Sequence, residues 1–209
     1  MPNFLGFDYI YPVTKGSRRN VQGDDTISYS ARTTETPGQR FYFSIGLEPS
    51  GLTEAESPLE AHYAAFYNTR FEIPVPNNPP ITQKNASVRA VTVANQAAER
   101  TNRFQFTSRS SGGARAWTPA NGEYIRLVNH NKIYIITSTR HSTSITGGVE
   151  FVTGTLIVAP NILVTAPDGT GIVIDPNVVV RYANPSNLSL TLTRTGYAMP
   201  RIEVEEAYA

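Results

Sequence analysis

The chain of 209 residues is long enough to bury a sizeable core, and its 18 Lys and Arg balance 17 Asp and Glu, so no net charge attracts nucleic acid or an anionic membrane. It contains no cysteine, which excludes disulfides, thiol nucleophiles and cysteine-based zinc or iron–sulfur sites. It lacks both a secretory leader and an apolar run near the roughly 18 residues that a membrane helix needs, so we expect a soluble protein made in a cytoplasm, without membrane insertion.

The N-terminal segment, residues 2–13, is rich in aromatic side chains. A terminus this apolar should be tied down, either in the core or on a neighbouring subunit. Its large side chains are therefore candidate subunit-interface residues: Phe4, Phe7, Tyr9 and Tyr11. The polar, glycine-containing stretch 15–25 that follows predicts a loop.

Two strands and one helix are predicted next. Residues 26–34 and 40–47 alternate apolar and polar side chains, which is typical of half-buried strands. The sequence SPLE at 57–60 is a capping box, and it predicts a short helix over 58–67. His62 lies beside the apolar stripe of this helix. We interpret it as a packing residue, because no second ligand has a spacing that suits a metal.

Arginines and aromatic residues are interleaved between residues 100 and 117. They are Arg100, Arg103, Phe104, Phe106, Arg109, Arg115 and Trp117. A single-stranded nucleic-acid site can have this pattern. We favour a loop that contacts solvent or another protein, because the whole chain is close to neutral. Trp117 could also stack on a sugar, although packing in the core is the preferred interpretation.

The stretch EYIRLVNHNKIYIITSTRHS at 123–142 predicts a β-hairpin around which the fold is organised. Two β-rich runs, 124–128 and 133–136, flank the Asn-His-Asn turn at 129–131, and the polar run 137–144 closes the hairpin. Both runs carry large apolar residues on both faces. A hairpin with one wet face would alternate, so we expect this one to be covered on both sides.

Charged side chains are the exceptions in this hairpin. We expect Arg126 and Lys132 to pair with carboxylates or to extend their charged ends to solvent. His130 and Lys132, at the turn, are two further candidate subunit-interface residues.

The remaining sequence favours short strands separated by turns. They are predicted at 148–153, 156–158, 161–165, 171–174, 178–182 and 188–195. The fold class is therefore mostly β, a β-sandwich or barrel-like core with one short α-helix and long loops. We expect a single domain over 1–209, with a weak seam near 77–84 or 110–120.

The sequence contains no catalytic or cofactor-binding motif that we recognise, so we expect a non-enzymatic protein without cofactors or metals. It has no G-x-S-x-G nucleophile motif, no phosphate-binding glycine loop, no EF-hand and no dinucleotide fingerprint. His130 and His141 have no accompanying carboxylate pattern, and a metal would need at least a third ligand. The Asp24-Asp25 pair is interpreted as a turn cap rather than an acid/base pair.

Three segments resemble small virion proteins of tailed bacteriophages, those of the tail and baseplate in particular. They are a strand, capped helix and Pro-terminated strand over 40–77, the hairpin with a polar turn over 121–142, and closing strands with an acidic tail over 178–209. The resemblance lies in composition and element order from about Arg40 onward. It carries over no functional residue, because no diagnostic motif is matched.

The resemblance implies a structural subunit of a tail, baseplate or connector ring, assembled in the bacterial cytoplasm and located in the virion. Its partners would be copies of itself, with a hexamer as the preferred number, and neighbouring tail or baseplate proteins. Ordered termini and strand edges that reach neighbours suit such a ring. The alternative is a carbohydrate-binding β-sandwich module on a tail fibre, and a hydrolase is the weakest possibility.

Overall fold

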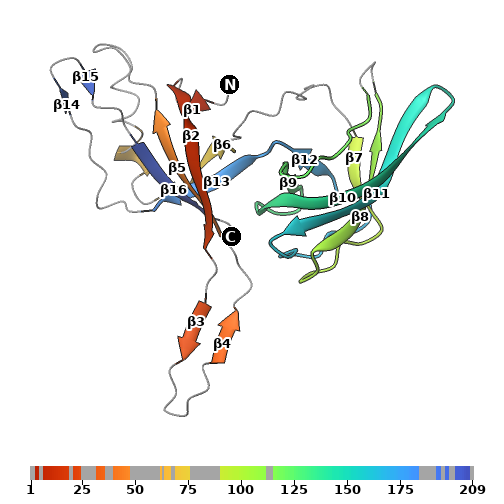
Figure 1. The fold of residues 1–209 in the computed structure, drawn as a ribbon, viewed down its shortest axis with the longest axis horizontal. Coiled ribbons are helices and arrows are strands. Elements are labelled where there is room, and N and C mark those ends of the chain that lie inside the picture. The colour runs from red at the N-terminus through yellow and green to blue at the C-terminus, as the bar shows by residue number, and fades with distance from the viewer. Residues whose placement is uncertain are drawn as a thin grey trace. The chain divides into compact units, whose positions relative to one another are not determined.

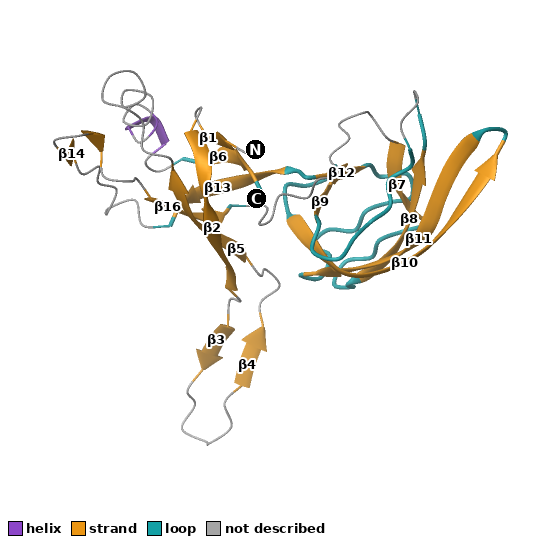
Figure 2. Cartoon of the chain, turned by 45° about the horizontal axis from the view of Figure 1, so that its top comes forward, coloured by secondary structure: helices purple, strands orange, loops and turns teal. Residues whose placement is uncertain are grey.

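The computed structural model confirms a mostly β fold (Figures 1 and 2). It describes residues 3–4, 7–18, 21–24, 32–35, 40–47, 62, 64–66, 69–75, 90–111, 115–183, 192–193, 196–197 and 201–207. Helical residues in this part are 62 and 64–66, inside the helix predicted over 58–67. The capping residues of that helix lie outside the described part.

The chain divides into two compact units, where the sequence predicts one domain. Unit 1 comprises residues 1–18, 40–82 and 177–209, and unit 2 comprises 19–39 and 83–176. The expected seam at 77–84 contains the boundary between 82 and 83, although its residues lie outside the described part. The other expected seam, 110–120, lies inside unit 2.

Unit 1 is built on a six-stranded sheet in the order β1-β2-β5-β16-β13-β6. The strands are β1 (Asn3–Phe4), β2 (Phe7–Arg18), β5 (Arg40–Leu47), β16 (Arg201–Glu206), β13 (Asn177–Tyr182) and β6 (Phe71–Pro74). β2 continues through Lys15 to Arg18 by pairing with β5, and residues 21–24 also form a strand, so the loop predicted over 15–25 is wrong at 15–18 and at 21–24. The polar side chains of residues 15–18 favour a loop, but their backbone pairing with β5 stabilises a strand. The register of β2 shifts between Ile10 and Thr14, around Pro12, which cannot donate to the ladder.

An aromatic cluster in unit 1 holds the described helical turn against the sheet. His62 is buried, stacks on Phe66 and meets the edge of Phe71, with ring centroids 4.4 and 4.7 Å away. Its Nδ1 lies 2.9 Å from the hydroxyl of Tyr182. Burial lowers the pKa of His62, so this ring packs as a neutral group. Its interpretation as a packing residue is confirmed.

Two small hairpins complete the described strands outside the larger sheets. β3 (Val21–Asp24) pairs with β4 (Arg32–Glu35), and β14 (Leu192–Thr193) pairs with β15 (Gly196–Tyr197). Residues 32–34 of the strand predicted over 26–34 lie in β4, and the earlier residues of that prediction lie outside the described part.

Unit 2 contains a six-stranded antiparallel sheet that curls into a barrel, in the order β12-β9-β10-β11-β8-β7. The strands are β7 (Ala90–Ala94), β8 (Arg103–Arg109), β9 (Tyr124–Leu127), β10 (Ile133–Thr146), β11 (Val149–Ala159) and β12 (Ile172–Ile174). Its two edges meet where Thr92 bridges Gly171, and the N–H of Val93 donates to the carbonyl of Thr170 at 2.8 Å. This closure buries one continuous core.

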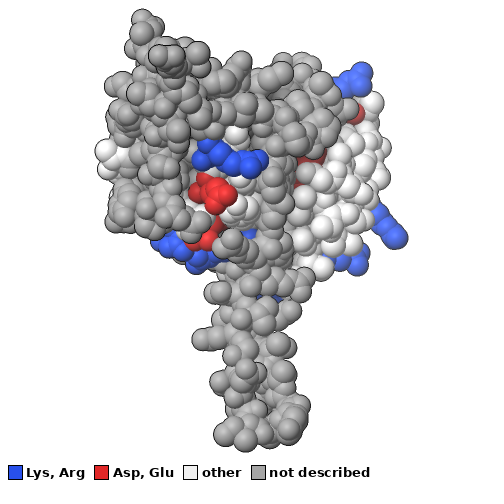
Figure 3. Space-filling view, turned by 60° about the vertical axis from the view of Figure 1, so that its left-hand side comes forward, with Lys and Arg blue, Asp and Glu red and all other residues white. Residues whose placement is uncertain are grey.

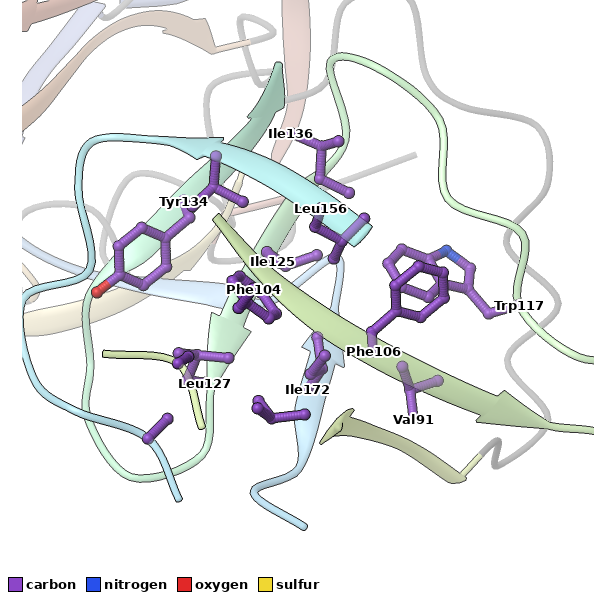
Figure 4. Close-up of a cluster of buried hydrophobic side chains, with 14 of the residues drawn as sticks. Val91, Phe104, Phe106, Trp117, Ile125, Leu127, Tyr134, Ile136, Leu156 and Ile172 are labelled. Atoms are coloured by element: carbon purple, nitrogen blue, oxygen red, sulfur yellow. The ribbon is translucent and has the colours of Figure 1, made fainter. Parts of the chain in front are cut away.

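The barrel core is filled by alternate residues of its strands (Figure 4). In β8, Phe104 and Phe106 point inward, and Phe106 packs on Trp117 with ring centroids 5.5 Å apart. Tyr134 and Ile136 of β10 are almost fully buried in the same cluster. The neighbours Tyr124 and Ile125 are both buried, as is Ile133, so the expectation of cover on both faces holds at these residues. Val128 is 64% exposed and does not meet this expectation.

Candidate assembly surface

Strand β10 changes character after its first four residues. Ile133 to Ile135 pair with β9, the pairing with β11 begins at Ile135, and the backbone of Ile136 still exchanges hydrogen bonds with Gly122 and Glu123. From Thr137 to Thr146 its described partner is β11 alone. We call this ten-residue stretch, TSTRHSTSIT, the open edge. The hairpin therefore does not close at 137–144, as the sequence predicts, but continues as a strand.

A β-bulge marks the point where β10 becomes the open edge. The register shifts between Ile136 and Ser138, which leaves Thr137 as the extra residue. The hydroxyl of Thr137 donates to the carbonyl of Ile157 at 3.0 Å and ties the bulge to β11. Such bulges bend a strand and terminate pairing on one side.

The ribbon of β10 and β11 extends beyond the other strands of unit 2 (Figure 1). It reaches the pair Thr146–Val149 and turns through Gly147 and Gly148, whose φ angles are 58° and 77°. Two successive positive φ angles suit the tight turn of a two-residue hairpin, and glycine adopts them without a steric cost. Ile145, near the tip, is 74% exposed.

The opposite edge of this ribbon is covered by β8. The pairing of β8 with β11 runs to Arg109 and Phe151, and two hydrogen bonds of 2.9 Å then join Ser110 to Glu150. Of the two long edges of the ribbon, β10 therefore carries the one that no described strand covers. The backbone N–H and C=O groups of the open edge that point away from β11 have no partner among the described residues, so another strand could pair with them.

The outer face of the ribbon carries a row of hydroxyl groups across four strands. Cross-strand register places Ser142 opposite Thr153, Thr153 opposite Thr107, and Thr107 opposite Thr92. Phe106 and Val152, the neighbours of this row along their strands, point into the core, so the row faces outward.

The open edge has one formal charge, on Arg140, and carries no proline or acidic residue.

Gly154 allows β10 to approach β11 closely. It pairs with His141, and a Cβ atom added to it would overlap the Arg140 carbonyl oxygen and lie 2.7 Å from the Cα of His141. Any other residue would push the two strands apart. Gly154 therefore does not form a turn, but allows the close approach that sets the path of the open edge.

His130, a candidate interface residue, is half-buried and makes its hydrogen bonds inside unit 2. Its Nε2 lies 2.6 Å from the hydroxyl of Tyr134, and its Nδ1 lies 2.8 Å from Oδ1 of Asn129. The amide of Asn129 donates to the Thr165 carbonyl, and the N–H of Leu163 donates to the Tyr134 hydroxyl. The network is satisfied by a neutral ring that donates from Nδ1 and accepts at Nε2.

Burial, reinforced by the positive charges of Lys132 and Arg126, lowers the pKa of His130 to about 4. Lys132, the other candidate at the turn, is 1% exposed, so it does not extend to solvent. Arg126 is half-buried, and its Nε has no hydrogen-bond partner among the described residues. The role of His130 and Lys132 at a subunit interface stays a prediction.

The N-terminal candidates lie in the sheet of unit 1. Phe4 of β1 pairs with Phe7 of β2, and Tyr9 of β2 pairs with Leu47 of β5. The backbone of this segment is thus held by its own unit. The side chains of Phe4, Phe7, Tyr9 and Tyr11 lie outside the described part, and their role as interface residues stays a prediction.

The aromatic residues among the arginines are buried. Phe104, Phe106 and Trp117 are all in the core, whereas Arg103 and Arg109 alternate to the outer face of β8. The indole Nε1 of Trp117 donates to Oε2 of Glu123 at 3.2 Å. Core packing of Trp117 is thereby confirmed, and these aromatic rings offer no exposed stacking platform for bases or sugars.

Charge on the described surface is mixed in sign. Arg40 and Arg181 both contact Glu205 of unit 1, and basic and acidic groups lie next to each other in Figure 3. The described residues contain no cluster of three or more His, Asp or Glu side chains that could hold a metal. No helix in the described part is long and apolar enough to cross a membrane.

Sequence reasoning missed the open edge because it relied on apolar side chains to find strands. Two signals were present. Thr residues recur at 137, 139, 143 and 146, and the Gly147-Gly148 pair is a hairpin turn signal.

No protein-family model matches the chain, and no curated protein matches its sequence.

Proposed function

We propose that the chain is a non-enzymatic structural subunit that assembles with copies of itself in the tail, baseplate or connector of a tailed-phage virion. The single observation that carries the assembly role is the open edge of β10, displayed on a ribbon that extends beyond the barrel. A row of unpaired backbone donors and acceptors is a ready template for another strand.

The energetics of the ribbon support an assembly role. Its open edge buries little apolar surface, since every side chain from Arg140 to Thr146 is exposed. An exposed strand of this length contributes little to the barrel core, because the residues of β10 in that core are Tyr134 and Ile136, both before the open edge. A monomer thus gains little from a strand this long, whereas a neighbouring chain could use its full length.

The virion location and the preferred ring of six rest on the sequence resemblance. The alternative of a carbohydrate-binding module rested on Trp117 and the tyrosines. Trp117 is 3% exposed and hydrogen-bonded to Glu123, and Tyr124, Tyr134 and Tyr182 are also buried. We therefore do not propose the alternative.

Mass photometry from nanomolar to micromolar concentration tests the proposal, first on the chain alone and then with the products of its neighbouring genes. We expect discrete oligomers whose masses are multiples of the 22.9 kDa chain. Mass spectrometry of purified particles should find the chain in the virion. Monomers under every condition, together with absence from particles, would refute the proposal.

A further inference from the structure

We propose that the open edge of β10 pairs with the open edge of a second copy of this chain, antiparallel and around a two-fold axis at Ser142. The inference rests on the proposed function, because both require self-association. It goes further by naming the strand, the direction and the register of one contact.

The backbone of the open edge is suited to strand addition. In an antiparallel ladder, alternate residues direct both N–H and C=O to the same side, so about five of the ten edge residues face a possible partner. The stretch 137–146 has no proline to interrupt the ladder. Natural edges are commonly protected by lysine, proline or inward-pointing charge, and this one has only Arg140.

The faces of the ribbon restrict the register. Thr143 lies opposite Val152 of the core, so odd-numbered residues from 139 to 145 share the inner face and even-numbered residues share the outer face. A two-fold axis perpendicular to the sheet keeps outer residues opposite outer residues. The axis must then pass through one residue of the strand rather than between two.

Ser142 is the residue that gives a long pairing without placing two charged groups or two imidazole rings opposite each other. An axis there aligns Ser138 with Thr146 and uses nine residues of the edge. It places Arg140 opposite Ser144 and His141 opposite Thr143, so no charge meets its own copy. An axis at Arg140 would place two guanidinium groups face to face and would shorten the pairing, and an axis at His141 would place two imidazole rings face to face and would include the bulge residue Thr137.

The chemistry of the edge favours a second copy over a different chain. Hydroxyl side chains opposite hydroxyl side chains form favourable cross-strand pairs, and six of the nine residues from 138 to 146 are Ser or Thr. A foreign strand selected for this edge would be expected to place a carboxylate opposite Arg140. Self-pairing needs no carboxylate, because Ser144 of the second copy lies opposite Arg140.

A contact of this kind is isologous and closes at two copies. A ring of six would therefore contain three such pairs, joined by a different surface. The proposal predicts an even number of copies in the assembly.

Disulfide trapping tests the register directly, since the chain has no cysteine of its own. Directly opposite residues in an antiparallel pair have Cα atoms about 4.5–5.5 Å apart, within the range that a disulfide spans. Ser142→Cys should give covalent dimers under mild oxidation. The matched control is Thr153→Cys, because Thr153 lies opposite Ser142 on β11, is also exposed and is not on the edge. It should give few dimers.

Substitutions that introduce a charge at position 142 supply a second, independent measurement. Ser142→Glu places two carboxylates face to face only in the dimer, so its self-association should weaken at least about tenfold, while Thr153→Glu should change it little. Mixing Ser142→Glu with Ser142→Lys chains should restore dimers. Circular dichroism should show the wild-type fold in all these variants, because both positions are exposed.

The outcomes separate the two proposals. If the chain self-associates but cross-links equally at positions 142 and 153, or if Ser142→Glu leaves its mass distribution unchanged, this inference is wrong and the proposed function stands. If Ser142→Cys cross-links only to a different protein, the second copy is the wrong occupant. If the chain never self-associates and is absent from particles, both proposals fall.

Discussion

Strand β10 has two parts of unequal length, here called its halves, which differ in almost every property except their backbone conformation. The first half, Ile133–Ile136, pairs with β9 and then with β11 and buries three of its four side chains in unit 2. The second half, Thr137–Thr146, has one described neighbour and exposes nearly all of its side chains. The comparison teaches that side-chain burial holds the first half, whereas cross-strand hydrogen bonds to β11 hold the second.

The largest contrast should come from one substitution made in both halves. Ile136 is 1% exposed and Ile145 is 74% exposed. Ile136→Asp buries an unpaired charge, and we expect it to cost about 4 kcal/mol or more and to prevent folding of unit 2. Ile145→Asp, the matched control, should change the free energy of unfolding by less than about 0.5 kcal/mol. Urea denaturation followed by tryptophan fluorescence measures both.

A smaller effect is expected at Gly154, where the second half lies closest to β11. Gly154→Ala should force the Arg140 carbonyl away and cost about 3 kcal/mol, because backbone atoms rather than a flexible side chain must move. The rate of backbone amide hydrogen exchange should increase first in residues 139–146. Thr153→Ala, the neighbouring exposed position, should leave exchange there unchanged. Equal protection in the two variants would show that the close approach is not needed.

The turn that leads into the first half should also show a pH dependence, because it carries His130. The unfolded chain protonates His130 near its ordinary pKa of 6.5, but the folded chain does so only near 4. The unfolded state therefore binds more protons between these values, and stability should fall by about 2 kcal/mol as pH decreases from 6.5 to 4.

Urea midpoints at pH 7 and pH 4.5 measure this loss. His130→Gln should reduce the difference between the two midpoints. A difference unaffected by His130→Gln would assign the acid sensitivity to other groups.

The smallest effect is expected at the junction of the halves. Thr137→Val removes the hydroxyl that bonds to the Ile157 carbonyl, and because the site is exposed we expect a loss of about 0.5–1 kcal/mol. Thr143→Val, with no such bond in the described structure, should cost less. If the two variants had equal midpoints in urea, the bulge would not depend on that hydroxyl.

The sequence predicted the parts of the molecule in which apolar side chains repeat. The runs at 124–127 and 133–136 are strands as expected, and Trp117 packs in the core. The polar strands at 15–18, 21–24 and 137–146 were missed, because β5, β4 and β11 supply their hydrogen bonds and the residues themselves carry no apolar period. One boundary between the two units falls within the seam expected at 77–84, whereas no change in composition marks the other points where the chain passes between them.

The placement of β16 has a consequence for the order in which the molecule is completed during synthesis. The six barrel strands of unit 2 lie consecutively between residues 90 and 174. The sheet of unit 1 joins strands from both ends of the chain, and β16 lies between β5 and β13. A ribosome therefore delivers every strand of the barrel before residues 201–206 exist. Until those residues emerge, β5 and β13 each lack their shared neighbour, and unit 1 is the part of a nascent chain that needs protection from premature pairing.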